Sequence, residues 1–328
     1  MADGLADCTR FRAPRPMSVL STRRQALFGG FCLCCLPRLG FAAESFTLDE
    51  VGPGIFVRRG PDAEASPENA DAICNAGFIV GKDGVLVTES GGSLADGQWL
   101  RAEIGKRTTK PIRHVVMSHV HPDHIFGAGA FQEDKPAFIG HANLRQMLDA
   151  RGEYYRKRLA DILGADKAGT VVYPTMEVKE GAPAEIDIGE RTLKLTAHGT
   201  AHTPTDLSML DTGSGILFPA DLLSVGRIPS LDGSLTGWLK QVDVLKARGA
   251  RKAVPGHGPT LVDTEPSFAA LTRYLGTLRD ETKKAIDADV PIEKATKTVA
   301  QSERENWHLF DQYNARNVTQ AYQELEWQ

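Results

Sequence analysis

The sequence is poor in cysteine, and its few cysteines are gathered near the N-terminus. Of the five cysteines in 328 residues, four lie within the first 35 positions, and only Cys74 lies beyond them. A single cysteine cannot form an internal disulfide, so a disulfide-stapled fold is excluded for the rest of the chain. Stability must come from a hydrophobic core instead. A content of 41% hydrophobic and 24% charged residues is typical of a globular protein that builds one.

The sequence also lacks a long apolar run. The stretch Phe28–Leu36 is too short to span a bilayer as a stable anchor. It follows Arg23–Arg24 and precedes the small residues of Gly40–Ala42, an order typical of a twin-arginine export signal. We therefore expect residues 1–42 to be a signal peptide and the mature protein to be periplasmic, without a membrane anchor. The alternative is a basic, disordered N-terminus. Met17 is a second candidate start, because such signals begin with a short polar region.

Runs of basic residues are absent downstream of that segment. Removing residues 1–42 leaves 32 basic and 40 acidic side chains, a formal charge of −8. An acidic chain without basic runs argues against nucleic acid as a partner. The sequence contains no internal repeat and no low-complexity tract. We expect its partner to be a small-molecule substrate.

The densest cluster of chemically active side chains is His119, His121, Asp123 and His124, which fall within six residues. The apolar run Ile112–Met117 leads into the cluster and predicts a buried strand. The proline before Asp123 cannot donate a ladder hydrogen bond, so the chain leaves the sheet there. Imidazole and carboxylate groups are ligands that suit zinc. These residues are therefore candidate metal ligands at the C-terminal end of a strand.

A zinc site needs more ligands than one short motif supplies, and three further candidates follow. His202, Asp221 and His257 each come after an apolar run and open a loop. Together with the His-x-His-x-Asp-His motif, their order resembles that of the metallo-β-lactamase superfamily over about residues 46–261. This resemblance implies an α/β fold, an αββα sandwich with two facing sheets and helices outside. Runs of strands followed by helices along the chain favour the same architecture.

The resemblance also implies a role for each of the seven residues. One zinc ion would be held by His119, His121 and His202, the other by Asp123, His124 and His257, and Asp221 would bridge them. Two zinc ions per chain share an activated hydroxide that attacks the substrate, and iron is the alternative metal. Asp123 is in addition the candidate catalytic residue, as a proton relay to the leaving group.

Three other side chains compete for roles near the candidate ligands. Glu89 ends a predicted strand where relatives often carry Asp, so it is either a brace for the ligand loop or a solvated or capping residue. His198 competes with His202, but only His202, which is followed by Thr-Pro, matches the family pattern. His141 is expected to be a helix cap or a core contact.

The predicted elements divide the chain into three segments. After residues 1–42, residues 43–263 are expected to form the metallohydrolase domain and residues 264–328 a C-terminal helical extension. Within the domain, Phe46–Leu48 and Ile55–Arg58 are expected to pair as the first hairpin. The extension is either a packing cover on the sandwich or a lid over the substrate. Specificity is expected in the loops 60–72, 164–182 and 224–236.

The leading interpretation is an exported zinc-dependent hydrolase. Its signal, its ligands and the C-terminal pattern Asn317–Val318, Tyr322 and Glu324–Glu326 resemble the quinoprotein relay system zinc metallohydrolases. That resemblance implies a link to a periplasmic quinoprotein dehydrogenase system. The alternatives are a β-lactamase of the His-rich subclass and a thioester hydrolase, although Thr205–Asp206 replaces the Gly-His of the latter.

Two interpretations belong to other classes of protein. One is an iron-dependent persulfide dioxygenase, which uses one iron and dispenses with several of the ligands present here. The other is a non-enzymatic protein that binds a cofactor such as pyrroloquinoline quinone. The full set of seven ligands favours reactive metals and therefore an enzyme.

Overall fold

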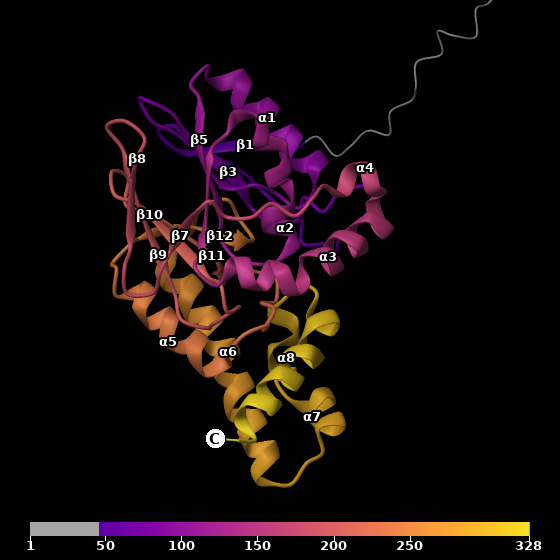
Figure 1. Ribbon diagram of the computed structural model, residues 1–328. Helices are drawn as coiled ribbons and strands as arrows, with labels where there is room; N and C mark the ends of the chain where they lie inside the picture. The colour runs from indigo at the N-terminus through magenta and orange to yellow at the C-terminus, as the bar shows by residue number, and fades with distance from the viewer. Residues whose placement is uncertain (1–45, 328) are drawn as a thin grey trace, which may run out of the picture. The chain divides into compact units, whose positions relative to one another are not determined.

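The structure, a computed structural model, describes residues 46–327. The expected signal peptide, residues 1–42, lies outside these residues. Within them, the buried hydrophobic side chains form three clusters. One cluster lies between two β-sheets and contains side chains from strands of both. Each of the other two clusters lies between one sheet and the helices that pack on its outer face (Figure 1). The expected αββα sandwich is confirmed.

The first sheet contains β1 to β7 in sequence order, among the described residues. Its strands pair antiparallel from β1 to β4 and parallel from β4 to β7. The side chains of β4 alternate, so that Val85 and Val87 face the helices while Leu86 faces the second sheet. The bounds are Leu48–Gly52, Ile55–Arg58, Ala76–Val80, Val85–Glu89, Ile112–Met117, Ala137–His141 and Met176–Val178.

The first hairpin differs from the expectation. Its first strand is Leu48–Gly52 and not Phe46–Leu48, because the register pairs Leu48 with Arg58 and Gly52 with Ile55. The strand therefore includes polar residues that an apolar pattern does not mark.

The second sheet has the order β13-β12-β11-β10-β9-β8. Neighbouring strands in this sheet pair antiparallel, except for β11 and β12, which pair parallel. In β9, Leu193, Leu195 and Ala197 point into the core between the sheets, as the two-residue period of a strand requires. The bounds from β8 to β13 are Ala184–Asp187, Thr192–Ala197, Leu207–Asp211, Ile216–Ser224, Lys252–His257 and Val262–Asp263.

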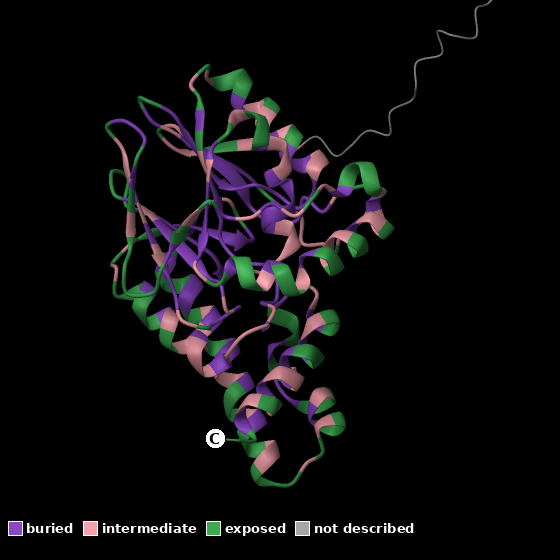
Figure 2. Ribbon diagram, in the orientation of Figure 1, coloured by how far each residue is buried: buried purple, intermediate pink, exposed green. Residues whose placement is uncertain are grey.

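Helices cover the outer face of each sheet, with their buried residues inward and their exposed residues outward (Figure 2). The first sheet is covered by α1 (Leu94–Arg107), α2 (Pro122–Ile125), η2 (Phe126–Asp134), α3 (Leu144–Leu163) and α4 (Ala165–Ala168). The second is covered by α5 (Leu235–Lys246) and α6 (Thr264–Asp287). The last helix, α8 (Phe310–Leu325), packs on α6, α7 (Ile292–Thr298) packs on α8, and η3 (Gln301–Asn306) connects α7 to α8. No helix in the described part of the chain is long and apolar enough to cross a bilayer.

The C-terminal helices are part of the core. Val318, Ala321 and Leu325 of α8 are buried in one cluster with Trp238 of α5 and Leu222 of β11. Removing this apolar surface from water stabilises the fold by about 25 cal/mol per Å². The extension therefore packs on the second sheet through α6, with α8 in the same core cluster.

Candidate metal centre

The seven candidate ligands lie where strands of both sheets end or bend. The turn from β5 into α2 carries His119–His124, and His202 lies in the loop between β9 and β10. Asp221 was expected to open a loop but lies within β11, which continues to Ser224, and His257 is the last residue of β12. Ala220 has a φ of 49°, in the left-handed region that most side chains avoid. The register against β12 is irregular at the same residue, so β11 bends immediately before Asp221.

Four of the seven residues form a first group: His119, His121, His202 and Asp221. His202 Nε2 lies 3.3 Å from His119 Nε2 and 3.0 Å from His121 Nδ1. Asp221 Oδ2 lies 3.5 Å from His202 Nε2. A tetrahedral zinc with bonds of about 2.0–2.1 Å would hold its ligand atoms about 3.3–3.4 Å apart. The spacing of these atoms therefore fits a tetrahedral ion.

The other three residues, Asp123, His124 and His257, form a second group beside the first. Asp123 Oδ2 lies 3.3 Å from His257 Nε2 and 3.5 Å from His124 Nε2. Asp221 Oδ1 lies 3.1 Å from His124 Nε2, and Asp221 Oδ2 lies 3.3 Å from His257 Nε2. Asp221 thus contacts the ligand atoms of both groups. A carboxylate in this place can bridge two cations.

Each imidazole also contacts a neighbour through its second nitrogen. The pairs are His119 Nδ1 with Ser118 Oγ at 3.0 Å, His121 Nε2 with Asp232 Oδ2 at 3.3 Å, His202 Nδ1 with the Ser230 carbonyl at 2.6 Å, His257 Nδ1 with the Ile73 carbonyl at 3.0 Å, and His124 Nδ1 with Glu89 Oε2 at 3.5 Å. Such contacts orient a ligand ring and fix which nitrogen faces the metal. Glu89 therefore lies where the sequence suggested, beside a ligand of the second group.

Two buried atoms at the centre support the fit. His124 Nε2 and Asp221 Oδ1 are buried and form no well-aligned hydrogen bond, although the two atoms lie 3.1 Å apart as an ion pair. Buried polar atoms whose hydrogen bonds are incomplete cost free energy, so these two atoms are suited to bind a further group. Imidazole nitrogen and carboxylate oxygen are the donor types that zinc and related metals prefer.

The charge states of these groups follow from burial and from their mutual contacts. Burial lowers the pKa of His202 to about 3, with a further contribution from His121, so His202 is neutral, as a ligand must be. Burial raises the pKa of Asp221, but the imidazoles of His257 and His124 outweigh burial and lower it well below the usual value. Burial lowers the pKa of His124, but Asp221 together with Cys74, Asp123 and Glu89 outweighs burial and raises it well above the usual value. A metal ion would take the place of that proton.

The two competing histidines lie outside both groups. His198 Nδ1 lies 2.8 Å from Gln241 Oε1, and its Nε2 lies 2.7 Å from Ser208 Oγ. His141 Nδ1 accepts a hydrogen bond from the Asn143 backbone at 3.0 Å, and its Nε2 contacts the His198 carbonyl at 3.2 Å. His198 and His141 are therefore polar core contacts.

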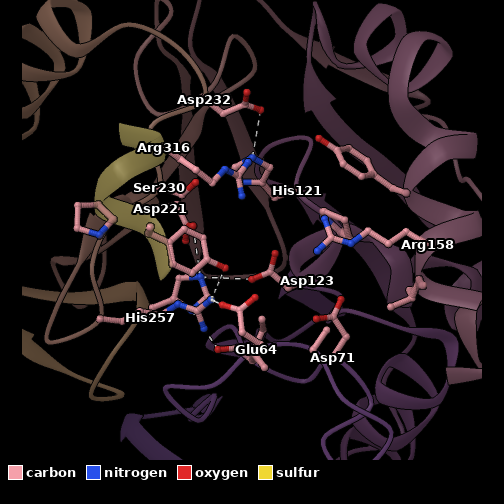
Figure 3. A pocket seen from close by; sticks show the side chains of 18 of the residues that line it. Glu64, Asp71, His121, Asp123, Arg158, Asp221, Ser230, Asp232, His257 and Arg316 are labelled. Atoms are coloured by element: carbon pink, nitrogen blue, oxygen red, sulfur yellow. Dashed lines mark hydrogen bonds and ion pairs between the residues drawn. The ribbon is translucent and has the colours of Figure 1, made fainter. Parts of the chain in front are cut away.

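A pocket of about 430 Å³ opens onto the second group and onto His121 (Figure 3). Its lining includes residues from the expected loops 60–72 and 224–236 but none from 164–182. That part of the expectation is wrong, because helices α3 and α8 form the remaining wall. Of the lining residues, Arg151, Arg158 and Arg316 lie outside the loops that the sequence marked, and Asp71, Ser230 and Asp232 lie in the expected loops but were not singled out. They belong to no short motif, so no local signal identifies them.

Comparison with known proteins agrees with this geometry. A sequence model of the metallo-beta-lactamase superfamily matches residues 70–257, more than half of the chain and all seven candidate ligands. A linear primary-alkylsulfatase from Pseudomonas sp. is 27% identical over 104 residues, 32% of this chain and 18% of that protein. The chain thus matches less than a fifth of that relative.

Solved structures show the same fold. A metallo-beta-lactamase from Pontibacter korlensis superposes with a TM-score of 0.57 at 17% identity, over 70% of this chain and 99% of that one. The DIM-1 metallo-beta-lactamase superposes with a TM-score of 0.55 at 15% identity, over 71% of this chain and 97% of that one. The protein belongs to the metallo-beta-lactamase superfamily, and its candidate metal centre is a cluster of histidine and aspartate side chains.

Proposed function

We propose that this protein is an exported hydrolase that works with two zinc ions. The observation that carries the proposal is the position of Asp221, whose two oxygens lie within 3.1–3.5 Å of imidazoles from both groups. The first ion would be held by His119, His121 and His202, the second by Asp123, His124 and His257, and Asp221 would bridge them. Zinc at such a centre activates water and polarises the substrate oxygen.

Residues of the chain prepare the site for this chemistry. The Ser230 carbonyl and the Asp232 carboxylate hold the rings of His202 and His121. Burial raises the pKa of Asp123, but His124 and His257 outweigh burial and lower it. The ionised Asp123 lines the pocket, so it can accept a proton and pass it to a leaving group.

The substrate class is a small molecule with a hydrolysable ester-type bond. The partial match to an alkylsulfatase makes sulfate esters one candidate substrate, while lactones, thioesters and β-lactams are others. We further propose a periplasmic location and a role beside a quinoprotein dehydrogenase system, on the basis of the N-terminal and C-terminal sequence patterns.

The alternative of a one-iron dioxygenase is less well supported. Such an enzyme needs fewer ligands, and here all seven candidate ligands lie in two adjoining groups. A protein that only carries a cofactor would need a pocket, but it would not need seven candidate metal ligands in two adjoining groups beside that pocket.

Two measurements test the proposal. Elemental analysis of the purified protein should find about two zinc ions per chain. The loaded protein should hydrolyse at least one member of a panel of sulfate esters, lactones, thioesters and β-lactams, and chelation should abolish that activity. One iron without zinc, together with oxygen consumption on a persulfide, would favour the dioxygenase instead.

A further inference from the structure

Positive charge is gathered at the rim of the pocket over the metal centre. The lining contains four arginines, Arg151, Arg158, Arg227 and Arg316, and, besides the candidate ligands Asp123 and Asp221, the acidic residues Glu64, Asp71 and Asp232. If the centre holds two divalent ions, their charge exceeds that of the Asp123 and Asp221 carboxylates. Whether the pocket attracts anions then depends on which arginines are already paired.

Two of the four arginines have partners within the protein. Arg151 forms an ion pair with Asp232, the residue that holds His121. Arg227 is buried and donates a hydrogen bond to the Ala63 carbonyl at 2.8 Å. The side chains of Arg151 and Arg227 therefore connect neighbouring segments of the pocket wall through contacts within the protein.

The other two, Arg158 and Arg316, form no ion pair with any described residue. Both are exposed and line the pocket. Arg158 comes from α3 and Arg316 from α8, so the two side chains enter from opposite helical layers (Figure 3). The guanidinium of Arg316 also lies 6.0 Å from the centre of the Tyr313 ring.

The wall next to Arg158 is apolar. Tyr154, Leu159 and Ile162 of α3 line the pocket, and Tyr154 is 63% exposed. An exposed aromatic side chain at a pocket mouth has apolar surface that a ligand can cover. The pocket thus combines a basic rim with an apolar wall.

We propose that Arg158 and Arg316 receive an oxyanion of the substrate, a carboxylate, sulfate or phosphate, while the α3 wall contacts its apolar part. The planar guanidinium matches the geometry of such oxyanions, and a positive rim raises the encounter rate with anions. This inference rests on the proposed hydrolase function, and it narrows the substrates to amphiphilic anions.

The test compares Arg158→Gln, Arg316→Gln and the double variant with Arg156→Gln. Arg156 lies on the same helix but pairs with Glu153 and does not line the pocket, so its variant loses the same charge elsewhere. We expect kcat/KM for mono-p-nitrophenyl glutarate to fall about threefold in each single variant and about tenfold in the double variant. The neutral p-nitrophenyl butyrate should be unaffected, as should Arg156→Gln. Equal losses on both esters would overturn the proposal.

Two further substrates distinguish the source of the oxyanion. If the anion belongs to the bond that is hydrolysed, p-nitrophenyl sulfate or p-nitrophenyl phosphate should show the same arginine dependence. If it lies elsewhere in the substrate, only the glutarate ester should show it. For the anionic substrate that is used, rising salt should slow the wild type and leave the double variant nearly unchanged, because salt screens exposed charges.

A binding measurement tests the proposed anion site without requiring the protein to hydrolyse the ligand. Calorimetry with hexanesulfonate, which has no hydrolysable bond, should show binding to the zinc-loaded wild type, weaker binding to the double variant, and little binding of the uncharged hexyl methyl sulfone. If no ester is hydrolysed but this order holds, the anion site stands and the proposed reaction fails. If hexanesulfonate binds wild type and double variant equally, the anion site is wrong.

Discussion

Asn317 of α8 holds the backbone of Leu231, whose N–H donates to the Asn317 side-chain oxygen at 2.9 Å. The Asn317 amide in turn donates to the Pro229 carbonyl at 2.7 Å. Between and beside these two points lie Ser230 and Asp232, which contact imidazoles of the first ligand group. A residue of the C-terminal extension therefore fixes the loop that orients the metal ligands. The extension both packs on the core and supports the site.

Replacing Asn317 should weaken metal binding. Asn317→Leu has a similar volume but leaves the Leu231 N–H and the Pro229 carbonyl without their partner, at about 1–3 kcal/mol for each. The loop should shift, and affinity for one ion should fall about 10–100-fold, as for other changes behind a ligand. Competition with a chromogenic chelator measures this affinity. Gln323→Ala, at an exposed position of the same helix, is the control; an unchanged affinity in Asn317→Leu would contradict the role.

Replacing Asp221 should separate the two ions. Asp221→Asn keeps the size of the side chain and removes the charge that offsets the repulsion between two cations. We expect one zinc to be lost or weakly held and activity to fall at least 10–100-fold. Circular dichroism should show an intact fold, because the sandwich core is separate from the centre. Asp263→Asn, which removes a charge at an exposed site, is the control. Two tightly held zinc ions with normal turnover in Asp221→Asn would show that Asp221 does not bridge.

The two histidines near residue 200 should differ in their effect on metal content. His202→Ala removes a ring whose Nε2 lies 3.0–3.3 Å from two other candidate ligands, so zinc content and activity should fall strongly. His198→Ala removes only contacts to Gln241 and Ser208, so it should lower stability more than zinc content. Elemental analysis and thermal melting of both variants decide the matter. Equal zinc loss in the two variants would mean that the assignment of His202, rather than His198, as the metal ligand is wrong.

His198 should make the stability of the protein depend on pH. Burial lowers its pKa in the folded state to about 4, against about 6.5 in an unfolded chain. Between these values the unfolded state binds more protons, so the free energy of unfolding falls as pH falls from about 6.5 to about 4. The contribution is on the order of 3 kcal/mol. In urea titrations of the metal-free protein, His198→Gln should show a smaller loss over this range; an identical loss would contradict the assignment.

Replacing Ala220 with glycine should stabilise the folded protein. Its φ of 49° costs an L-residue about 1–2 kcal/mol, whereas glycine loses about 0.5–1 kcal/mol through the greater freedom of its unfolded chain. The first effect is larger, so Ala220→Gly should raise the free energy of unfolding by about 0.5–1 kcal/mol. Ala253→Gly, at a buried site in β12 without such a φ, should lower it. Chemical denaturation compares the two, and a loss of stability in both would refute the strain at Ala220.

Local patterns in the sequence determined the fold class and the candidate ligands. The strand that leads to His119, the apolar run before Asp221 and the strand that ends at His257 are recognisable because apolar runs mark buried strands. Metal-ligating side chains are few in kind, so a dense cluster of them is informative. The preference for His202 over His198 as a ligand came from a short pattern. In the structure His202, and not His198, lies with the other candidate ligands, and its role as a metal ligand stays a prediction.

Only the tertiary structure decided what surrounds those ligands. Asp232 meets His121 across 111 positions of the chain, and Asn317 meets Leu231 across 86. The place of Arg158 and Arg316 on one pocket likewise depends on how α3 and α8 pack. Helical periodicity shows which face of a helix is buried, but not which residue from another element lies opposite. Contacts of this kind are set by the packing of the whole core, and for that reason no local stretch of sequence contains them.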